Sequence, residues 1–285
     1  MGFRGKVLFF ELGVTTLLLI LQSSCWSIRI YRFAPTVSEE VPMEICEQAP
    51  TRNFAFDISP DTLSLGLTGV YFTVTNLRNS EANGEFDQIK SETFATVLQG
   101  LSLEAIEKDP VLQGFRQLHD KVGCSGKKNV ASPENLLAML LSKSRLPSIN
   151  LLVDIYNLVS IETRLAIGAH DLKNIGGNVH LKITDGTEIF WPLGLGKQQS
   201  VGANEYAYVD DANEIICRLE VRQVEKTKIT LDTTDAFFIV QGNPATDGNH
   251  VWRAAEKLIE LTKRFCGGDE RILYRAHNDL ESYRS

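Results

Sequence analysis

The sequence lacks the basic excess that most nucleic-acid-binding proteins carry. Its 285 residues include 29 Lys and Arg against 36 Asp and Glu, which gives a formal net charge of -7 at pH 7. Proteins that follow a phosphate backbone over a long surface are usually rich in basic residues. The composition therefore argues against a long nucleic-acid-binding surface, but it is compatible with a pocket that holds only the end of a nucleic acid.

Signatures of several common catalytic and metal sites are also missing. The chain has no glycine-rich phosphate loop, HExxH, CxxC or Gly-x-Ser-x-Gly motif, and the Gly-Leu-Gly at 194–196 is predicted to be a turn. The cysteines have no metal-ligand spacing and are odd in number: Cys25, Cys46, Cys124, Cys217 and Cys266. Reduced, buried thiols are expected, which favours an intracellular location in the cytoplasm or an organelle. No metal or cofactor is expected.

No apolar run reaches the roughly 20 residues that span a bilayer comfortably. The run from Val7 to Leu21 follows Arg4 and Lys6 and is interrupted by Glu11. Basic residues followed by an apolar run are typical of a signal peptide or a short anchor. We predict that residues 1–26 form such a hydrophobic targeting or anchor segment, which would contact a membrane through residues 7–21. This makes a membrane-anchored or secretory location the alternative to the intracellular one. Residues 27–52, rich in Pro and Glu, are predicted to be a linker.

The remainder of the chain carries blocks of strand and helix patterns. Short runs of β-branched and aromatic residues predict strands at 54–58, 69–75, 179–183, 188–191, 205–209, 214–222, 228–231 and 236–241. Apolar spacing of three and four residues predicts helices within 86–122, from Ser132, from Ser148 and over 249–265. Asp185-Gly186 is expected to join the strands 179–183 and 188–191 as a hairpin. These blocks predict an α+β domain at 53–268, with a mostly antiparallel sheet packed with helices, and a charged tail at 269–285 that frays.

Three polar side chains outside this pattern are given structural roles. Ser132 precedes Pro133 and is expected to cap the helix that starts there. His119 lies near the end of a predicted helix, where a cation suits the last carbonyl groups. His180 alternates outward on its strand, which places it on the surface rather than among metal ligands.

The predicted helix from Ser148 carries an unusual polar stripe. Asn150, Asp154 and Asn157 follow one another at i, i+4 and i+7, which puts two amides and a carboxylate on one face. A solvated helix face is usually built from Lys, Glu and Arg, because Asn and Asp are poorer helix formers. The stripe is therefore either part of a binding site or a structural network that ties the helix to a neighbouring strand.

Two further groups have both a functional and a structural interpretation. His170-Asp171 fits an acid/base or carbonyl-polarising pair, or a turn in which Asp171 binds backbone amides. Arg218 and Arg222 lie on one side of a predicted strand, where they would meet a carboxylate or phosphate or form part of a solvated face.

Four stretches resemble one known family. They begin at Leu146 (Leu-Pro-Ser-Ile-Asn-Leu-Leu-Val-Asp-Ile-Tyr-Asn-Leu-Val-Ser), Ala166 (Ala-Ile-Gly-Ala-His-Asp-Leu), Lys173 (Lys-Asn-Ile-Gly-Gly-Asn-Val-His-Leu) and Glu225 (Glu-Lys-Thr-Lys-Ile-Thr-Leu-Asp-Thr-Thr-Asp-Ala-Phe-Phe). Each is similar to a segment of the B3/B4 editing domain of the phenylalanyl-tRNA synthetase beta subunit. The similarity covers about 130–242, and the whole of 53–268 looks like the free-standing B3/B4 proteins that have no synthetase body.

The resemblance implies a function. In the synthetase this domain hydrolyses tyrosine wrongly esterified to the phenylalanine tRNA, a second sieve that corrects what binding alone cannot. Asn157 matches a pocket asparagine of the family, and Glu225 matches the glutamate that reads the tyrosyl hydroxyl. Two departures put tyrosine specificity in question. Gly168 stands where the family has a pocket histidine, with His170 two residues on, and Glu220-Val-Arg-Gln-Val replaces Gly-Val-Met-Gly-Gly.

The expected function is that of an aminoacyl-tRNA-binding protein that hydrolyses mischarged aminoacyl-tRNA in trans. Its partner would be a tRNA acceptor end or an aminoacyl ester, and no catalytic residue is assigned. The expected substrate-binding residues are Asn150, Asp154, Asn157, His170, Arg222 and Glu225. The alternative is a non-enzymatic module of the same fold that binds an amino acid or a small carboxylate.

Overall fold

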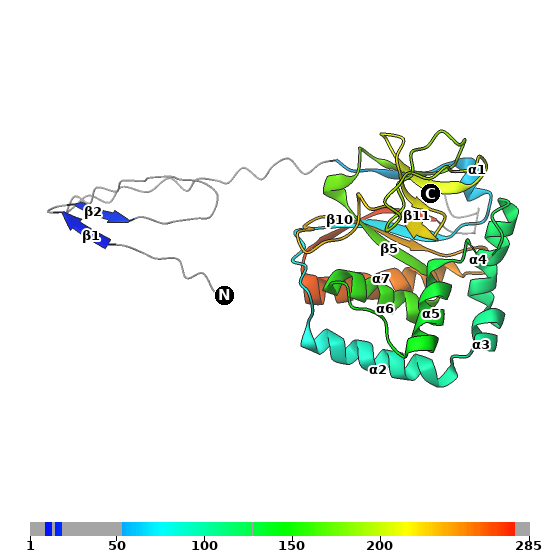
Figure 1. Cartoon of the computed structure of the whole chain (residues 1–285), viewed down its shortest axis with the longest axis horizontal. Helices are drawn as coiled ribbons and strands as arrows, with labels where there is room; N and C mark the ends of the chain where they lie inside the picture. Colours follow the sequence, from blue (N-terminus) through cyan, green and yellow to red (C-terminus); the bar gives the residue numbers. More distant parts are fainter. Residues whose placement is uncertain (1–8, 13–14, 19–52, 127, 277–285) are drawn as a thin grey trace, which may run out of the picture. The chain divides into compact units, whose positions relative to one another are not determined.

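The computed structural model describes residues 9–12, 15–18, 53–126 and 128–276 (Figure 1). The chain divides into two compact units, Met1–Arg52 and Asn53–Ser285. In the first unit, β1 (Phe9–Leu12) pairs antiparallel with β2 (Thr15–Leu18). The rest of the predicted anchor at 1–26 and the predicted linker at 27–52 lie outside the described residues. Across the described ranges, no helix is both long enough and apolar enough to cross a membrane.

The second unit contains two sheets and a set of helices. Its strands are β3 (Phe56–Ile58), β4 (Gly69–Thr75), β5 (Ala166–Asp171), β6 (Val179–Ile183), β7 (Tyr206–Asp210), β8 (Ile215–Arg218), β9 (Arg222–Gln223), β10 (Ala236–Gln241) and β11 (Asp269–Ala276). Its helices are α1 (Pro60–Leu63), α2 (Gly84–Gly100), α3 (Leu103–Lys108), α4 (Pro110–Lys121), α5 (Ser132–Lys143), α6 (Leu151–Thr163) and α7 (Gly248–Cys266), with a 3-10 turn at Leu172–Asn174.

One sheet has the order β11-β4-β10-β5, and the other has the order β3-β6-β7-β8-β9. Every strand pair is antiparallel except β3 with β6, which is parallel. This confirms the predicted α+β fold with a mostly antiparallel sheet. The helices α2, α5, α6 and α7 lie on one side of the four-stranded sheet in Figure 1, and the five-stranded sheet lies on the other side.

Strand β10 explains how the layers are held together. All of its residues are buried, which explains why its sequence is a continuous apolar run rather than an alternating one. Phe238 and Val240 join the core under the helices, and Phe238 stacks on Phe72 of β4 with ring centroids 4.9 Å apart. Phe237 and Ile239 point the other way, into the core between the two sheets. The four-stranded sheet is thus the middle layer of the domain.

Two predicted strands are corrected by the structure. The turn at Asp185-Gly186 forms, with Gly186 at φ +90°, but residues 188–191 do not pair with β6. The antiparallel partner of β6 is the fully buried strand β7, which offers it a larger apolar surface. Residues 228–231 are not a strand either. The carbonyl of Thr230 instead accepts a hydrogen bond from the side-chain amide of Asn79, at 2.9 Å.

The frayed tail is corrected for the residues that the structure describes. Asp269–Ala276 form β11, which pairs antiparallel along the outer side of β4 with a bulge between Ile272 and Tyr274. The charged residues at the start of β11 led to the prediction of a frayed tail, but an edge strand tolerates charge on its exposed side. Residues 277–285 lie outside the described residues.

The helix start at Ser132 differs by one position. Ala131 is the N-cap of α5 and no side chain caps it, so Ser132 is the first helical residue. The backbone N–H of Ser132 donates to the carbonyl of Glu220, at 3.0 Å. This bond fixes the start of α5 against the segment between β8 and β9.

Candidate functional site

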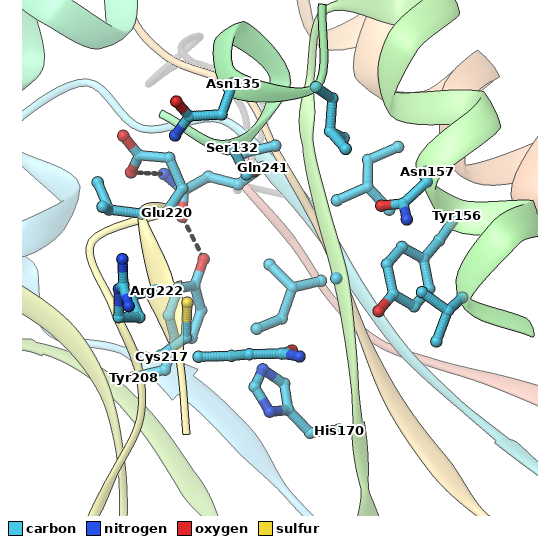
Figure 2. A pocket seen from close by; sticks show the side chains of 18 of the residues that line it. Ser132, Asn135, Tyr156, Asn157, His170, Tyr208, Cys217, Glu220, Arg222 and Gln241 are labelled. Carbon is cyan, nitrogen blue, oxygen red and sulfur yellow. Dashed lines mark hydrogen bonds between the residues drawn. The ribbon is translucent and has the colours of Figure 1, made fainter. Parts of the chain in front are cut away.

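A cavity of about 290 Å³ lies beside β5, one of the two edge strands of the four-stranded sheet (Figure 2). Its walls come from α5, α6, β5, the end of β10 and the β8–β9 segment. The lining residues are Ser132, Asn135, Leu136, Met139, Ile149, Val153, Tyr156, Asn157, Ala166, Ile167, Gly168, His170, Tyr208, Cys217, Glu220, Val221, Arg222, Gln223, Ile239 and Gln241.

One wall is largely apolar and comes from the helices. Leu136 and Met139 on α5 face the cavity together with Val153 and Tyr156 on α6. Ile149, just before α6, also lines the cavity and is 62% exposed. Together these side chains form a surface that suits an apolar or aromatic group.

The opposite wall contains a buried carboxylate held by several donors. Glu220 is 6% exposed and accepts hydrogen bonds from the Tyr206 hydroxyl at 2.5 Å and from Gln241 Nε2 at 3.1 Å. Gln241 Oε1 in turn accepts a hydrogen bond from the Tyr208 hydroxyl, as the dashed lines of Figure 2 show. Because these hydrogen bonds join Tyr206, Glu220, Gln241 and Tyr208 in series, they fix the side chains at this end of the cavity.

His119 is the buried partner of Glu220, and the carboxylate favours the protonated form of its ring. Its Nδ1 lies 2.8 Å from the carbonyl oxygen of Asn129, so Nδ1 donates, and its Nε2 contacts Glu220 Oε1. Burial opposes charging of the ring, but the hydrogen bond and the negative charge of Glu220 outweigh burial and raise the pKa of His119. His119 does lie in the last turn of α4, as predicted, but its partner is a carboxylate far away in the sequence.

His170 has the opposite electrostatic character. It is 1% exposed, and its Nδ1 lies 2.8 Å from the Thr227 hydroxyl. Burial lowers its pKa to about 3, so the ring is neutral at pH 7. Among the described residues, its Nε2 has no hydrogen-bond partner. Such a ring is a poor proton acceptor for activating water, but it can orient a bound group through a hydrogen bond.

Asp171, next to it, has a structural role. Its Oδ1 accepts a hydrogen bond from the backbone N–H of Lys173 at 2.9 Å, and its Oδ2 accepts one from the Thr233 hydroxyl at 2.8 Å. The structure therefore shows the turn interpretation of His170-Asp171 rather than an acid/base pair.

Three further lining residues shape what the cavity can bind. Arg222 is exposed, and its Nη1 lies 3.5 Å from the carbonyl of Leu193; in the described part of the chain it forms no ion pair. Cys217 faces the cavity, but burial raises its pKa to about 12, so the thiol is protonated at neutral pH. A Cβ atom added to Gly168 would meet no atom within 4 Å, so the space beside this part of β5 is open.

Of the six predicted site residues, Asn157, His170 and Arg222 line the cavity. The other three lie elsewhere. Asn150 is the N-cap of α6 and accepts a hydrogen bond from the N–H of Val153 at 3.1 Å. Asp154 pairs with Lys90 of α2 at 2.8 Å, and the exposed Glu225 pairs with Lys228.

Sequence reasoning assigned no binding role to three lining residues that form the polar wall. Glu220 was noted as a departure from the family pattern, which was a signal for its position. Gln241 is a polar residue at the end of the apolar run of β10, and Tyr208 sits on β7, which is buried along its whole length. No local pattern connects these side chains, because they come from separate strands.

Comparisons with known proteins give one family match. A family model described as "B3/4 domain" matches residues 118–267, which is more than half of the chain and contains every residue that lines the cavity. A comparison with curated proteins gave no match. Among solved structures 17 chains match. One of them is an N-terminal fragment of the phenylalanyl-tRNA synthetase beta-subunit from Pyrococcus horikoshii, with 16% identity and a TM-score of 0.41; the match covers 77% of this chain and 50% of that fragment.

Proposed function

Since this chain belongs to the B3/4 domain family, we propose that its cavity binds the aminoacyl end of a tRNA and that the protein hydrolyses mischarged aminoacyl-tRNA in trans. Family membership agrees with the resemblance seen in the sequence. The observation that carries the proposal is the cavity itself, in which an apolar wall from α5 and α6 faces a fixed polar wall around Glu220.

The size and charge of the site favour the end of a tRNA over a longer stretch. A cavity of about 290 Å³ lies at the lower limit of small-molecule sites, which are commonly about 300–1,000 Å³. It has room for an aminoacyl group rather than for several nucleotides. Arg222 lies at the cavity without a carboxylate partner in the described residues, and a guanidinium suits a phosphate or the ribose oxygens next to the ester.

The chemistry would depend on positioning rather than on a strong nucleophile. The Cys217 thiol is protonated, and neutral His170 is a weak base. Holding an ester and a water molecule at the correct distance can still supply a large part of a rate enhancement. His170 and the Gln241 amide are the groups suited to holding them, because both lie in the cavity wall and both are fixed by hydrogen bonds.

The test is hydrolysis of a panel of mischarged tRNAs by the full chain. We expect selective turnover of one aminoacyl species, with turnover reduced at least about tenfold in Asn157→Ala and His170→Gln if each removes one hydrogen bond to the bound ester. His180→Gln is the matched control, because His180 lies outside the cavity and pairs with Asp57 and Asp211. Wild-type turnover in all three variants would exclude this cavity as the site.

A second candidate function is a non-enzymatic binding module for an amino acid or a small carboxylate. The guanidinium of Arg222, which has no ion-pair partner in the described residues, favours it, since a carboxylate is a bidentate partner for Arg. The same proteins tested against free amino acids by calorimetry separate the two functions. Binding of a free amino acid, without turnover of any mischarged tRNA by the folded protein, would establish the binding module.

A further inference from the structure

The outer edge of β5 has its own hydrogen-bonding pattern. In an antiparallel pair, alternate residues direct both their N–H and C=O toward the neighbouring strand, and the residues between them direct both groups away. The backbone N–H of Leu172 donates to Asp235, before β10, at 2.9 Å, whereas that of Asp171 donates to Thr227, outside the sheet, at 2.9 Å. Counting back from Asp171, the main-chain groups of Ala169 and Ile167 therefore also point away from β10.

Both ends of this edge have partners, and the middle does not. The carbonyl of Leu165 accepts a hydrogen bond from the Ser160 hydroxyl at 2.7 Å, and Thr227 takes the N–H of Asp171. Between them, the outward N–H and C=O groups of Ile167 and Ala169 have no protein partner in the described residues. Ile167 is 6% exposed and lines the cavity. A buried main-chain group without a partner is costly, so the outward groups of Ile167, the one of the two residues that lines the cavity, favour a ligand that can pair with them.

We propose that the main-chain N–H and C=O of Ile167 bind the carbonyl oxygen and the α-ammonium group of an α-aminoacyl ligand, as a single residue of an added strand would. In a hydrogen-bonded antiparallel pair, two opposing residues exchange both bonds, so one amino acid completes the arrangement. This inference rests on the proposed ligand class, and it assigns the recognition of the aminoacyl group to the backbone rather than to a side chain.

The same geometry orients the ligand. Directly opposed residues of an antiparallel pair point their side chains to the same face of the sheet. Ile167 belongs to the core on the helix side of the sheet, so the ligand side chain would lie on that side, where Tyr156 and Asn157 line the cavity. The ester would continue antiparallel to β5, past Ala166, toward Gln241, which is paired with Ala166 in the sheet. The side chain and the ester thereby reach different walls.

The ligand arm of the test uses L-amino acid amides, which carry the α-ammonium and carbonyl groups but no tRNA. The full chain is titrated with the twenty amides by calorimetry, and the amide that binds is compared with its α-hydroxy and deamino analogues. Because a hydrogen bond from a charged donor is strong, we expect each analogue to bind about 10- to 100-fold more weakly. Equal binding of the amide and the deamino analogue would overturn the proposal, and so would the absence of binding by every amide.

The protein arm removes the donor itself. Ile167→Pro deletes the outward N–H, a change that an edge strand tolerates, while Ile167→Ala shortens the side chain and keeps the N–H. We expect at least about tenfold weaker amide binding by Ile167→Pro and a smaller loss by Ile167→Ala, which keeps the N–H but removes part of the cavity wall. Ala169→Pro is the matched control, since Ala169 also points outward but is not a lining residue. If Ile167→Pro does not fold, the comparison of the amide with its analogues decides.

The two proposals fail separately. Hydrolysis of mischarged tRNA together with amide binding that ignores the α-ammonium group would leave the deacylase and overturn the role of Ile167. Amide binding that depends on Ile167, without hydrolysis of any mischarged tRNA, would support the backbone site and overturn the deacylase.

Discussion

Replacing Glu220 with Gln should destabilise the folded protein by about 3–5 kcal/mol near pH 6, the usual cost of breaking a buried ion pair on one side. The structure gives the reason. The carboxylate contacts the His119 ring and accepts hydrogen bonds from Tyr206 and Gln241. A glutamine side chain at this position has one acceptor oxygen and one NH₂ group, so it cannot accept all three hydrogen bonds, and it leaves the His119 cation buried without an anion.

The change should be large on the scale of a thermal transition. For a domain of 150–250 residues, each 1 kcal/mol shifts the midpoint by about 2–4 °C, so Tm should fall by roughly 6–20 °C. Urea unfolding at pH 6, followed by far-UV circular dichroism, gives the free energy directly. Glu225→Gln is the matched control, because Glu225 is exposed and forms an ion pair only with Lys228 in the described structure; its unfolding midpoint should stay at the wild-type value.

The pH dependence provides a sharper check. Glu220 raises the folded-state pKa of His119 above its unfolded value near 6.5. The stabilisation is therefore fully present below pH 6.5 and is lost as the pH rises through the folded-state pKa. The difference between wild type and Glu220→Gln should be largest below pH 6.5 and should shrink toward pH 9. The contribution of His180 is common to both proteins and cancels. A difference below about 1 kcal/mol at pH 6, or one that is constant from pH 5.5 to 9, would refute the buried ion pair.

Three further substitutions or labels test the packing around the site. Because burial raises the pKa of Cys217 to about 12, maleimide should label it at pH 7 only after unfolding in urea, as peptide mass spectrometry would show. Lys90→Met should cost about 1–3 kcal/mol in urea unfolding, since it removes the cation 2.8 Å from the buried Asp154 carboxylate. Gly114→Ala should cost about 1–3 kcal/mol, measured the same way, because its Cβ would lie 2.0 Å from Asn243 Oδ1.

The parts of the fold that the sequence predicted are those set by local signals. The apolar run of β10 and the strand at Gly69–Thr75 appear with the predicted ends, and α7 (Gly248–Cys266) differs by one residue at each end from the predicted helix over 249–265. The prediction of a strand that pairs with β6 after the Asp185-Gly186 turn was wrong. A turn sequence fixes how the chain reverses, but the choice of a sheet partner depends on which buried surface is available elsewhere, and β7 lies more than 20 residues away.

In the candidate site too, residues with a local sequence signal were predicted, and pairs formed by distant segments were not. The resemblance to a known family drew attention to Asn157, and His170 was named as half of a possible acid/base or carbonyl-polarising pair with Asp171. Glu220 and His119 are 101 residues apart in the sequence, and no spacing rule relates them. Their pairing exists because α4 and the β8–β9 segment meet in the folded domain, and burial then makes the charge of each side chain depend on the other. Only the structure shows that dependence.

The predicted polar stripe on α6 shows which features helical periodicity can predict and which it cannot. Three residues at helical spacing share a face only if all of them are helical, and Asn150 is the N-cap, with φ -161° and its side chain turned back to the helix amides. Asp154 and Asn157 do share a face, and both border a small hollow next to Lys90. Only Asn157 also reaches the large cavity, because it lies one turn further along α6, beside the open edge of β5. Helical spacing thus predicted the neighbours along α6, while the position of a strand edge determined which of them can meet a ligand.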